Sequence, residues 1–452
     1  MKATTALLFL AAAVTATAAA APSSPQAHHQ HARRQNAKEY DVLTTPDADI
    51  AALLASSSIA DDDAVISATF DNPRFRGFSG AFTDEEVAAL RAADGVVVSV
   101  REAVEEKMVV PEVRRRRRMG MGGKKKREVV EKRQESGGGV ESRDDATWGL
   151  QRISQEGKVE VVGGSTTGRG YTYTWKDTST LGAGVDIYVM DSGIYTEHEE
   201  FGGRAIEGYN FYPDQPGDKF GHGSHCAGSA AGSTVGVATN ASLISVKVIS
   251  DDGLGSTSGY LGGIDWILSR HANRSTEADF VASVVSISLS WSTVFETIDT
   301  ATKELTAAGL HVAIAAGNTY DDACTYSPAS LGGAANANDV LVVGASTIAD
   351  SILWFSSTGP CVDVYAPGAE IVSAAVTGGP TDYVSDSGTS MATPHVAGLL
   401  AVLAGDDAAG LADSPAAAKE RVVALARGAG VLAQNENFVE GGEVLLVGNG
   451  VY

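Results

Sequence analysis

Residues Val185 to Ile194 read VDIYVMDSGI, and this stretch does most to decide the fold. Its first six residues form a short apolar run, which is typical of a β-strand buried on both faces of a helix-covered parallel sheet. The run ends at Asp191, and in such sheets the ligand site lies beyond the carboxyl ends of the strands. Asp191 is therefore a candidate functional residue, although an aspartate in this position often only caps the next turn.

Further apolar runs follow this one and alternate with helical patterns. The runs are Leu243 to Ile249, Val281 to Leu289, His311 to Ala316 and Val340 to Val343, and the helical stretches include Tyr260 to Leu268, Glu296 to Ala308 and Thr389 to Leu403. Buried strands that alternate with helices predict an α/β sandwich with a mostly parallel sheet. We assign this domain to residues 148–452.

Composition and charge narrow the class of protein. The chain has 452 residues, 44% of them hydrophobic and 20% charged, which fits a packed soluble protein and excludes wholesale disorder or a polytopic membrane protein. The net charge is −22, and from Trp148 onward 13 basic residues face 34 acidic ones. Such a surface repels phosphates, so we expect neither nucleic acid nor membrane as a partner. We also expect a monomer.

The first residues have the pattern of a secretory signal peptide. Lys2 precedes an apolar run from Ala6 to Val14, and small residues suited to signal peptidase follow up to about residue 20. The run is shorter than the roughly 20 residues that span a bilayer, and no later segment is long enough to do so. We expect a cleaved signal peptide at residues 1–20 and an extracellular protein. Vacuolar targeting is an alternative that the sequence does not separate from secretion.

Two further segments precede the main domain. In residues 38–110, extended and helical patterns follow one another in the order β-α-β-β-α-β, with a capping-box helix start at Thr83 to Glu86. This order predicts a small α+β ferredoxin-like domain. Residues 111–147 lose this periodicity and carry runs of basic residues such as Arg114 to Arg118. We interpret them as an exposed linker with processing sites. Nucleic-acid binding and a translated intron are the alternatives for this segment.

Two motifs in the main domain add candidate chemistry to Asp191. In the first, His222-Gly223-Ser224-His225-Cys226-Ala227-Gly228, an imidazole stands at the mouth of a helix of small residues. The second runs from Ser387 to Gly398, SGTSMATPHVAG, and puts Ser390 at the start of a buried helix. Because proline is tolerated near the first turn, we expect Pro394 to mark where that helix begins. The helix dipole would favour negative charge that develops beside the Ser390 hydroxyl.

With these motifs in hand, the sequence resembles the subtilisin-like serine peptidases, in particular their proteinase K branch. The matching stretches are Asp191-Ser192-Gly193, the His222 motif, Ala315-Ala316-Gly317-Asn318 and Gly388 to His395. The order Asp, His, Ser along the chain is that of subtilisin. The resemblance covers residues 148–452 and implies a three-layer subtilisin-like sandwich, while the domain before it looks like the inhibitory propeptide of this family.

The resemblance implies a role for each candidate catalytic residue. Ser390 would attack the scissile carbonyl, His222 would transfer the proton, and Asp191 would orient the imidazole. Asn318 and the Ser390 backbone N–H would stabilise the oxyanion. Taken alone, Asn318 would be interpreted as a turn residue. His225 and His395 would be structural, and no catalytic cofactor is implied.

The resemblance also implies two backbone segments that bind an extended peptide substrate. These are Gly253-Leu254-Gly255 and Ser288-Leu289-Ser290. Relatives usually carry Leu-Gly-Gly where this chain has Leu289-Ser290-Trp291. Ser290 could narrow the specificity pocket, and Trp291 could cover it or face solvent. We hypothesise that medium apolar residues are preferred over large aromatic residues before the cleaved bond.

The three cysteines and one aspartate carry the remaining expectations from the resemblance. Cys324 and Cys361 match positions that are bridged in some relatives, and Cys226 is expected to be a free buried thiol beneath His222. Asp363 corresponds to a calcium carboxylate in proteinase K, but the loop from Leu331 to Asp339 differs from that pattern. We therefore treat a structural calcium ion as a hypothesis whose ligands are unknown.

The sequence is best interpreted as a secreted serine endopeptidase made as a zymogen, with broad, apolar-leaning specificity. Its partners would be protein or peptide substrates and its own propeptide, which would act as an intramolecular inhibitor. The sequons at Asn240 and Asn273 would be glycosylated on export. The competing hypothesis is a catalytically latent protein of the same fold that keeps its prodomain docked.

Overall fold

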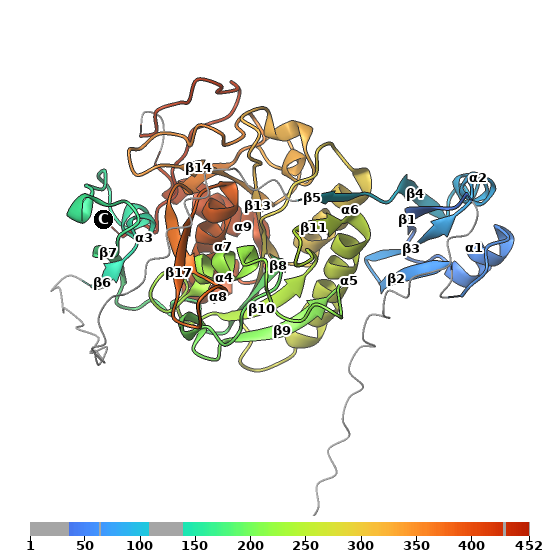
Figure 1. Ribbon diagram of the computed structural model, residues 1–452, viewed down its shortest axis with the longest axis horizontal. Coiled ribbons are helices and arrows are strands. Elements are labelled where there is room, and N and C mark those ends of the chain that lie inside the picture. The colour runs from blue at the N-terminus through green and yellow to red at the C-terminus, as the bar shows by residue number, and fades with distance from the viewer. Residues whose placement is uncertain (1–35, 63–64, 108–138, 428–430, 452) are drawn as a thin grey trace, which may run out of the picture.

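The computed structural model describes residues 36–62, 65–107, 139–427 and 431–451. The expected signal peptide (1–20) and residues 111–138 of the expected linker lie outside this range. Figure 1 shows a small N-terminal domain beside a larger body, whose strands are enclosed by helices. Within the described residues, none of the helices is long and apolar enough to cross a membrane.

The N-terminal domain, called the prodomain from here on because it is the expected propeptide, has the expected β-α-β-β-α-β order. Its elements are β1 (Lys38–Thr44), α1 (Ile50–Ser56), β2 (Ile66–Asn72), β3 (Phe75–Phe82), α2 (Asp84–Arg91) and β4 (Val97–Glu102). The strands form an antiparallel sheet in the order β2-β3-β1-β4. Helix α2 begins with the predicted capping box, in which Thr83 and Glu86 satisfy each other's backbone N–H. The prodomain is therefore ferredoxin-like, as expected.

A seven-stranded sheet forms the centre of the larger body. Its strands are β8 (Val185–Asp191), β9 (Ala205–Asn210), β10 (Ser242–Lys247), β12 (Ala282–Ile287), β13 (His311–Ala315), β14 (Leu341–Ser346) and β15 (Val364–Pro367). They lie in the order β15-β14-β13-β12-β8-β10-β9, and all of the pairings are parallel. The apolar runs of the sequence thus form neighbouring strands, with β8 inside the sheet.

Helices cover both faces of this sheet and make it the middle of three layers. On one face, α4 (His222–Ala231) and α7 (Thr389–Asp406) share a buried core with Ile187 and Val189 of β8. On the other face, α5 (Thr257–Arg274) and α6 (Glu296–Ala307) pack with Tyr188 and Met190. Side chains alternate between the two faces along β8, which explains why its sequence is apolar almost throughout.

Shorter elements complete the body. They are α3 (Trp148–Ile153), β7 (Tyr171–Lys176), β11 (Leu254–Ser256), β16 (Ile371–Ala374), β17 (Tyr383–Asp386), α8 (Ala408–Leu411) and α9 (Pro415–Leu425). Short 3-10 turns lie at Val162–Gly164, Glu199–Phe201, Ala323–Thr325 and Ala329–Leu331. Strands β16 and β17 form an antiparallel hairpin that leads directly into α7.

The end of the expected linker belongs to the folded body instead. Residues Val140–Ala146 form strand β6, which pairs antiparallel with β7. Arg143 fixes this strand, because its guanidinium donates to the carbonyls of Ser233 and Gly236. The sequence of β6 is polar and lacks alternation, so periodicity alone did not reveal it. Strand β6 forms because it pairs with β7.

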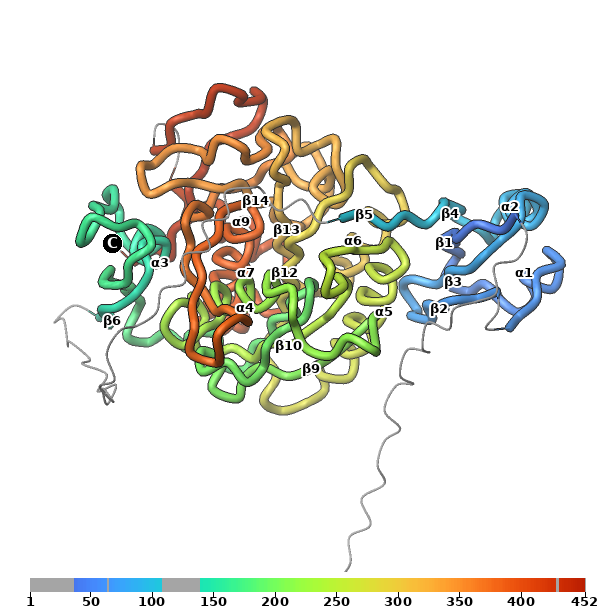
Figure 2. Tube along the Cα trace, viewed as in Figure 1, coloured from blue at the N-terminus to red at the C-terminus, as the bar shows by residue number. Residues whose placement is uncertain are grey.

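The prodomain lies against α5 and α6, on the side of the body opposite β6 and β7 (Figure 2). The sheet face away from α1 and α2 carries Leu43, Phe70 and Phe75, which belong to the same buried cluster as α5. Beside them, the buried Asp41 carboxylate accepts hydrogen bonds from Ser258 Oγ at 2.7 Å and from Thr257 Oγ1. The prodomain therefore buries an apolar face and a hydrogen-bonded carboxylate against the body.

Candidate active site

Asp191 is the last residue of β8 and is fully buried. Its Oδ1 accepts a hydrogen bond from the Ser192 N–H at 2.7 Å, which holds the carboxylate at the carboxyl edge of the sheet. The chain then turns sharply at Gly193, whose φ is +107°. A Cβ atom there would come within 2.4 Å of the Gly217 carbonyl oxygen, so only glycine fits this turn.

His222 is the first residue of α4, and its ring lies against Asp191. The Nδ1 atom is 2.9 Å from both carboxylate oxygens, which makes Nδ1 the protonated nitrogen and leaves Nε2 as a proton acceptor. Gly223 permits this approach, since a Cβ there would lie 2.2 Å from the Gly193 carbonyl oxygen. Burial disfavours the charged imidazolium, but the Asp191 carboxylate outweighs it and holds the pKa of His222 well above its ordinary value.

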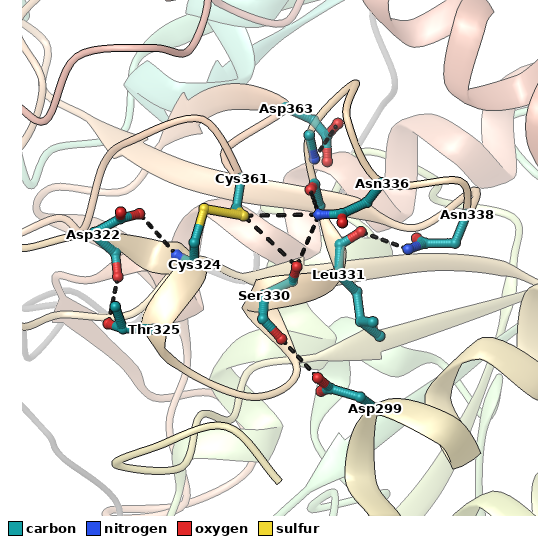
Figure 3. Close-up of a disulfide and its surroundings, with 12 residues drawn as sticks. Asp299, Asp322, Cys324, Thr325, Ser330, Leu331, Asn336, Asn338, Cys361 and Asp363 are labelled. Carbon is teal, nitrogen blue, oxygen red and sulfur yellow. Dashed lines mark hydrogen bonds between the residues drawn. A yellow bond between two sulfur atoms is a disulfide. The ribbon is translucent and has the colours of Figure 1, made fainter. Parts of the chain in front are cut away.

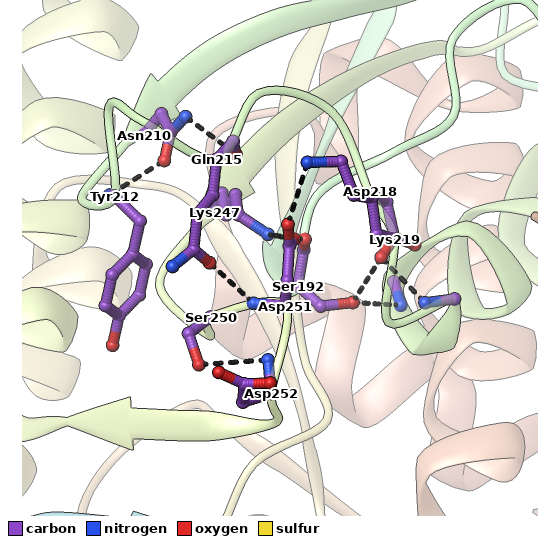
Figure 4. Close-up of polar contacts among 12 residues, drawn as sticks. Ser192, Asn210, Tyr212, Gln215, Asp218, Lys219, Lys247, Ser250, Asp251 and Asp252 are labelled. Carbon is purple, nitrogen blue, oxygen red and sulfur yellow. Dashed lines mark hydrogen bonds and ion pairs between the residues drawn. The ribbon is translucent and has the colours of Figure 1, made fainter.

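A buried hydrogen-bond network around Asp218, which the sequence did not reveal, joins the turn after Asp191 to the start of the helix that carries His222 (Figure 4). The Asp218 carboxylate accepts the backbone N–H groups of Gly221 (2.7 Å) and Ser224 (2.9 Å), which are unsatisfied at the start of α4. It also accepts the Ser192 hydroxyl at 3.0 Å. Asp218 thus caps the helix that carries His222 and ties it to the turn after Asp191. An acidic residue four positions before His222 was the signal for it.

Lys247 supports the same turn from the neighbouring strand β10. Its buried ammonium group donates to the Ser192 carbonyl at 2.5 Å and to Asp251 Oδ1 at 3.0 Å. Asp251 also forms an ion pair with Lys219 at 3.2 Å (Figure 4). A buried charge is retained when it is paired, so this lysine holds the loops after β8 and β10 in one arrangement.

Ser390 is the second residue of α7, whose N-terminus points at the carboxyl edge of the sheet. Its hydroxyl donates to the Ser288 carbonyl at 3.4 Å. Pro394 lies inside this helix, and it does not mark the helix start as we expected. Because proline lacks an N–H, the Ser390 carbonyl has no partner four residues on. It accepts instead from Ser288 Oγ (3.1 Å) and Cys226 Sγ (3.3 Å), which fixes the first turn to β12 and α4.

Asn318 follows β13 and lies beside the same turn of α7. Its Oδ1 accepts hydrogen bonds from the Thr389 N–H at 2.9 Å and from the Thr389 hydroxyl at 3.1 Å. Since the amide oxygen is held this way, the Nδ2 group is left as the free donor end of the side chain. A Cβ on Gly388 would lie 3.6 Å from Nδ2 and 3.7 Å from the Ser390 nitrogen, so both nitrogens lie close to Gly388.

The two expected substrate-binding segments lie at the cleft edge, and one of them is already paired. Strand β11 carries Leu254 and Gly255 and pairs antiparallel with β5 (Glu105–Lys107), a strand that follows the prodomain sheet. Gly253 precedes β11 with a φ of +80°, and the carbonyl of Ser288 from the second segment reaches Ser390. The prodomain chain thus occupies the edge expected to bind an extended peptide.

Trp291, which follows the second segment, differs from one of its two expectations. Ser290 is exposed, but Trp291 is only 5% exposed and packs edge to face on Tyr260, with ring centroids 4.8 Å apart. With Leu289, these residues line a cavity of about 30 Å³ beside β5. Trp291 therefore does not face solvent, because Tyr260 holds it in the buried apolar cluster, while its covering of the specificity pocket stays a prediction.

Comparison with known proteins agrees with this geometry. Residues 182–442 match the subtilase family, and residues 13–106 match the peptidase inhibitor I9 family. Subtilisin-like protease 2 of Pseudogymnoascus destructans is 41% identical over 63% of this chain, and subtilisin-like protease 3 of Saccharomyces cerevisiae is 33% identical over 82% of it. The chain belongs to the subtilase family.

The relatives differ in how much of their length the chain accounts for. It spans 64% of the Pseudogymnoascus subtilase, which is just under two thirds, and 69% of the Saccharomyces one. Among solved structures, that of a cold adapted subtilisin-like serine proteinase superposes with a TM-score of 0.56 at 34% identity and covers 68% of this chain and 98% of that protein. The three-layer fold expected from the motifs is thereby confirmed as that of a subtilase.

The other two histidines in the motifs of this subtilase are buried and held by backbone carbonyls. His225 Nε2 lies 3.0 Å from the Ile371 oxygen, and His395 Nδ1 lies 2.8 Å from the Met391 oxygen. Burial lowers the pKa of both rings, that of His395 to about 4. Neutral, buried imidazoles that support the backbone fit the structural role expected for them.

The cysteines of the subtilase are arranged as expected. Cys324 and Cys361 form a disulfide with a Cα–Cα distance of 5.3 Å, which joins the loop after Asn318 to the segment before β15 (Figure 3). Cys226 is a buried free thiol 3.8 Å from His222 Nδ1. Asp191, His222 and Cys226 are also the one group in the described part of the chain whose atoms could jointly hold a metal ion.

The carboxylate that matched a calcium ligand in subtilases has other partners here. Asp363 Oδ1 accepts the Gly333 N–H at 3.1 Å and pairs with Lys419 Nζ at 2.9 Å, and Oδ2 accepts the Val342 N–H at 2.8 Å. The same ammonium group donates to the Val340 carbonyl at 2.8 Å. A lysine from α9 thus fills the position between a carboxylate and a carbonyl, so the residues here do not fit a calcium ion.

Proposed function

We propose that this subtilase is the precursor of a serine endopeptidase with an Asp191-His222-Ser390 triad. The observation that carries the proposal is the Asp191–His222 contact at 2.9 Å at the sheet edge where the α7 N-terminus presents Ser390. These residue types in this arrangement generate a nucleophile from a hydroxyl group. The family's chemistry needs no catalytic cofactor.

Each member of the triad would have a separate task. His222 Nε2 would take the proton of the Ser390 hydroxyl as that oxygen attacks the scissile carbonyl, and would return the proton to the leaving amine. Asp191 would hold the Nδ1 tautomer and stabilise the imidazolium, in line with the raised pKa of His222. The Ser390 hydroxyl donates to the Ser288 carbonyl in the precursor, so it would have to rotate toward His222 before attack.

Asn318 would stabilise the oxyanion that forms on the substrate. Its Nδ2 group and the Ser390 N–H both lie close to Gly388 and would be the two donors to the oxyanion, and the dipole of α7 would add a positive partial charge there. The contact between its Oδ1 and Thr389 supports this role, because it orients the donor end before any substrate binds. Donors fixed in advance need no reorganisation when the charge develops.

The prodomain would act as an intramolecular inhibitor, since β5 pairs with the strand that a substrate would use. Basic residues in the linker would make it accessible to processing enzymes, and processing would release the cleft. The described state is thus that of a latent precursor, and under the competing hypothesis of permanent latency the prodomain would stay docked after the linker is cut. Export, with a vacuole as the alternative destination and glycans at Asn240 and Asn273, belongs to the same proposal.

Substrate preference would be broad and apolar-leaning at the residue before the cleaved bond. Ser290 stands where relatives have glycine, and its side chain would narrow the pocket there. We therefore retain the preference for medium apolar over large aromatic residues at that position. Otherwise identical peptides that end in Leu or Phe before the leaving group would reveal it as a higher kcat/KM for Leu.

The test of the proposed function compares the full precursor with its Ser390→Ala variant. The parent chain should lose the mass of the prodomain and linker and gain peptide anilide hydrolysis that phenylmethylsulfonyl fluoride abolishes. The variant should do neither, because acyl transfer needs the Ser390 oxygen. Mass spectrometry and an absorbance assay provide the two readouts.

A second serine variant serves as the control. Ser414 stands before α9 and its side chain makes no cap hydrogen bond, so Ser414→Ala should process and hydrolyse peptides like the parent. Circular dichroism should give Ser390→Ala the helix content of the parent. If the parent shows no activity even after trypsin has cut the linker, permanent latency is correct and the proposal is wrong.

A further inference from the structure

The prodomain strand in the cleft carries an acidic side chain with two partners on the subtilase body. Glu106 lies opposite Gly255 in the β5–β11 pairing. Its Oε1 accepts the Ser292 hydroxyl at 2.6 Å, and its Oε2 accepts the Ser292 backbone N–H at 3.0 Å. One serine therefore supplies a donor to each oxygen of the carboxylate.

Glu106 lies beside a small cavity between the prodomain strand and the body. About 30 Å³ of space remains beside Glu106 and Lys107, and its lining also includes Trp291 and Tyr260, which pack edge to face. Among the described residues no ion pair involves Glu106, so the recognition comes from the two neutral donors.

We propose that Ser292 is a specificity-determining residue that selects glutamate in the substrate residue that pairs with Gly255. The inference deepens the proposed function and rests on it, because β5 binds the edge that a peptide substrate would use. A carboxylate accepts both donors of Ser292, and hydrogen bonds to a charged acceptor are stronger than those to an amide. A glutamine could also fill this position, since its amide oxygen accepts the Ser292 N–H and its NH₂ group can donate to the hydroxyl oxygen, but neither of these hydrogen bonds has a charged acceptor.

This preference would be local, and it would run against the charge of the whole surface. The subtilase body from Trp148 onward carries 34 acidic and 13 basic residues, which favours neutral or basic substrates at long range. Ser292 acts only at contact distance, on one substrate residue. The selected residue is therefore a single glutamate in an otherwise neutral peptide, and acidic peptides in general are not favoured.

The experiment uses the processed enzyme and a set of neutral acyl-peptide anilides in which glutamate replaces glutamine at one position at a time. Positions two to five before the anilide are scanned, since β5 ends at Lys107 in the pairing with β11. At one position only, glutamate should raise kcat/KM roughly fivefold over glutamine, in keeping with the added strength of a charged hydrogen bond. The ratio should stay constant from about pH 6 to about pH 9, because glutamate is ionised throughout that range.

Two variants of Ser292 tie the preference to this residue. Ser292→Ala removes the hydroxyl donor and should reduce the glutamate-to-glutamine ratio, while Ser292→Asp should reverse it by charge repulsion. In the ranges that the structure describes, the exposed neighbour Thr293 has no hydrogen bond to Glu106, so Thr293→Ala should keep the ratio of the parent.

The outcomes separate the inference from the proposed function. An enzyme that hydrolyses the glutamine peptides but prefers glutamate at none of the scanned positions overturns the inference alone. A preference that Ser292→Ala and Ser292→Asp both leave unchanged also overturns it. An enzyme that hydrolyses no peptide of either kind contradicts the proposed function itself.

Discussion

The side chains at the site are held by a small number of neighbours that take no part in the chemistry. Asp218 caps the helix that starts with His222, and Thr389 holds the oxygen end of Asn318. Both contacts satisfy polar groups that would otherwise be buried without partners, which costs about 1–3 kcal/mol each. The same hydrogen bonds therefore stabilise the fold and orient the reacting groups.

Asn318→Leu tests the most specific of these roles. Leucine has the same branched side-chain skeleton but no donor, so we expect kcat to fall by about 10²–10³ with little change in KM, the loss known for the corresponding asparagine of subtilisin. Steady-state kinetics on one anilide substrate would measure it. A rise in KM at constant kcat would instead indicate that Asn318 binds the ground state, which is not the proposed role.

Among the elements, helix α9 places a lysine ammonium group beside the ends of strands β14 and β15. Lys419 reaches from this helix to Asp363 and to the Val340 carbonyl, and its side chain is only 15% exposed. Burial raises the pKa of Asp363, while Lys419 and two backbone N–H groups favour the ionised carboxylate. We propose that this ammonium group stabilises the edge of β14 and β15 in the way that a bound metal cation would.

The proposal predicts a fold that does not depend on calcium at this point. The Tm of the Ser390→Ala precursor should be the same with EDTA as with millimolar calcium. Lys419→Met should lower the free energy of unfolding by about 3–5 kcal/mol, because it leaves a buried carboxylate without its partner. Added calcium should restore part of that loss. A fall of Tm with EDTA that is absent in Asp363→Asn would contradict the prediction.

At the scale of the whole molecule, the contact between prodomain and body contains a titratable group. Asp265 on α5 accepts the Asp71 N–H of the prodomain at 3.1 Å, and burial there raises the pKa of Asp265 to about 6. The nearby Asp71 charge acts in the same direction, while His271 on the same helix has a pKa lowered mainly by burial. Docking therefore favours the protonated form of Asp265.

The sign of this linkage predicts weaker docking at higher pH. A carboxyl group whose pKa is raised in the complex stabilises it below that pKa, and the advantage is lost as the pH rises through about 6. After the linker of the Ser390→Ala precursor is cut, the prodomain should bind about three- to fivefold more weakly at pH 7 than at pH 5, because a pKa raised to about 6 gives at most about tenfold over this range and partial solvent screening reduces it. Calorimetry would measure this difference.

Asp265→Asn separates this effect from the other ionisable groups. The amide cannot titrate but can still accept the Asp71 N–H, so binding should be nearly independent of pH between 5 and 7. Binding that tightens as the pH rises in the parent chain would show that another group, such as His271, dominates the linkage.

The sequence by itself determined the features that depend on neighbours along the chain. The apolar runs predicted the buried strands, because parallel strands covered on both faces have little room for polar residues. The capping box at Thr83 and the motifs around Asp191, His222, Asn318 and Ser390 were likewise local patterns. The resemblance they support also led to the Cys324–Cys361 disulfide, which the structure contains.

Only the tertiary structure decided which distant residues meet. Strand β6 has no pattern of its own and is ordered by β7, and Pro394 lies within α7 because two other elements satisfy the carbonyl that it frees. The contact of Glu106 with Ser292 spans 186 positions, and that of Lys419 with Val340 spans 79. Such contacts depend on strand register and on the packing of layers. The local sequence around either partner of a contact determines neither of them.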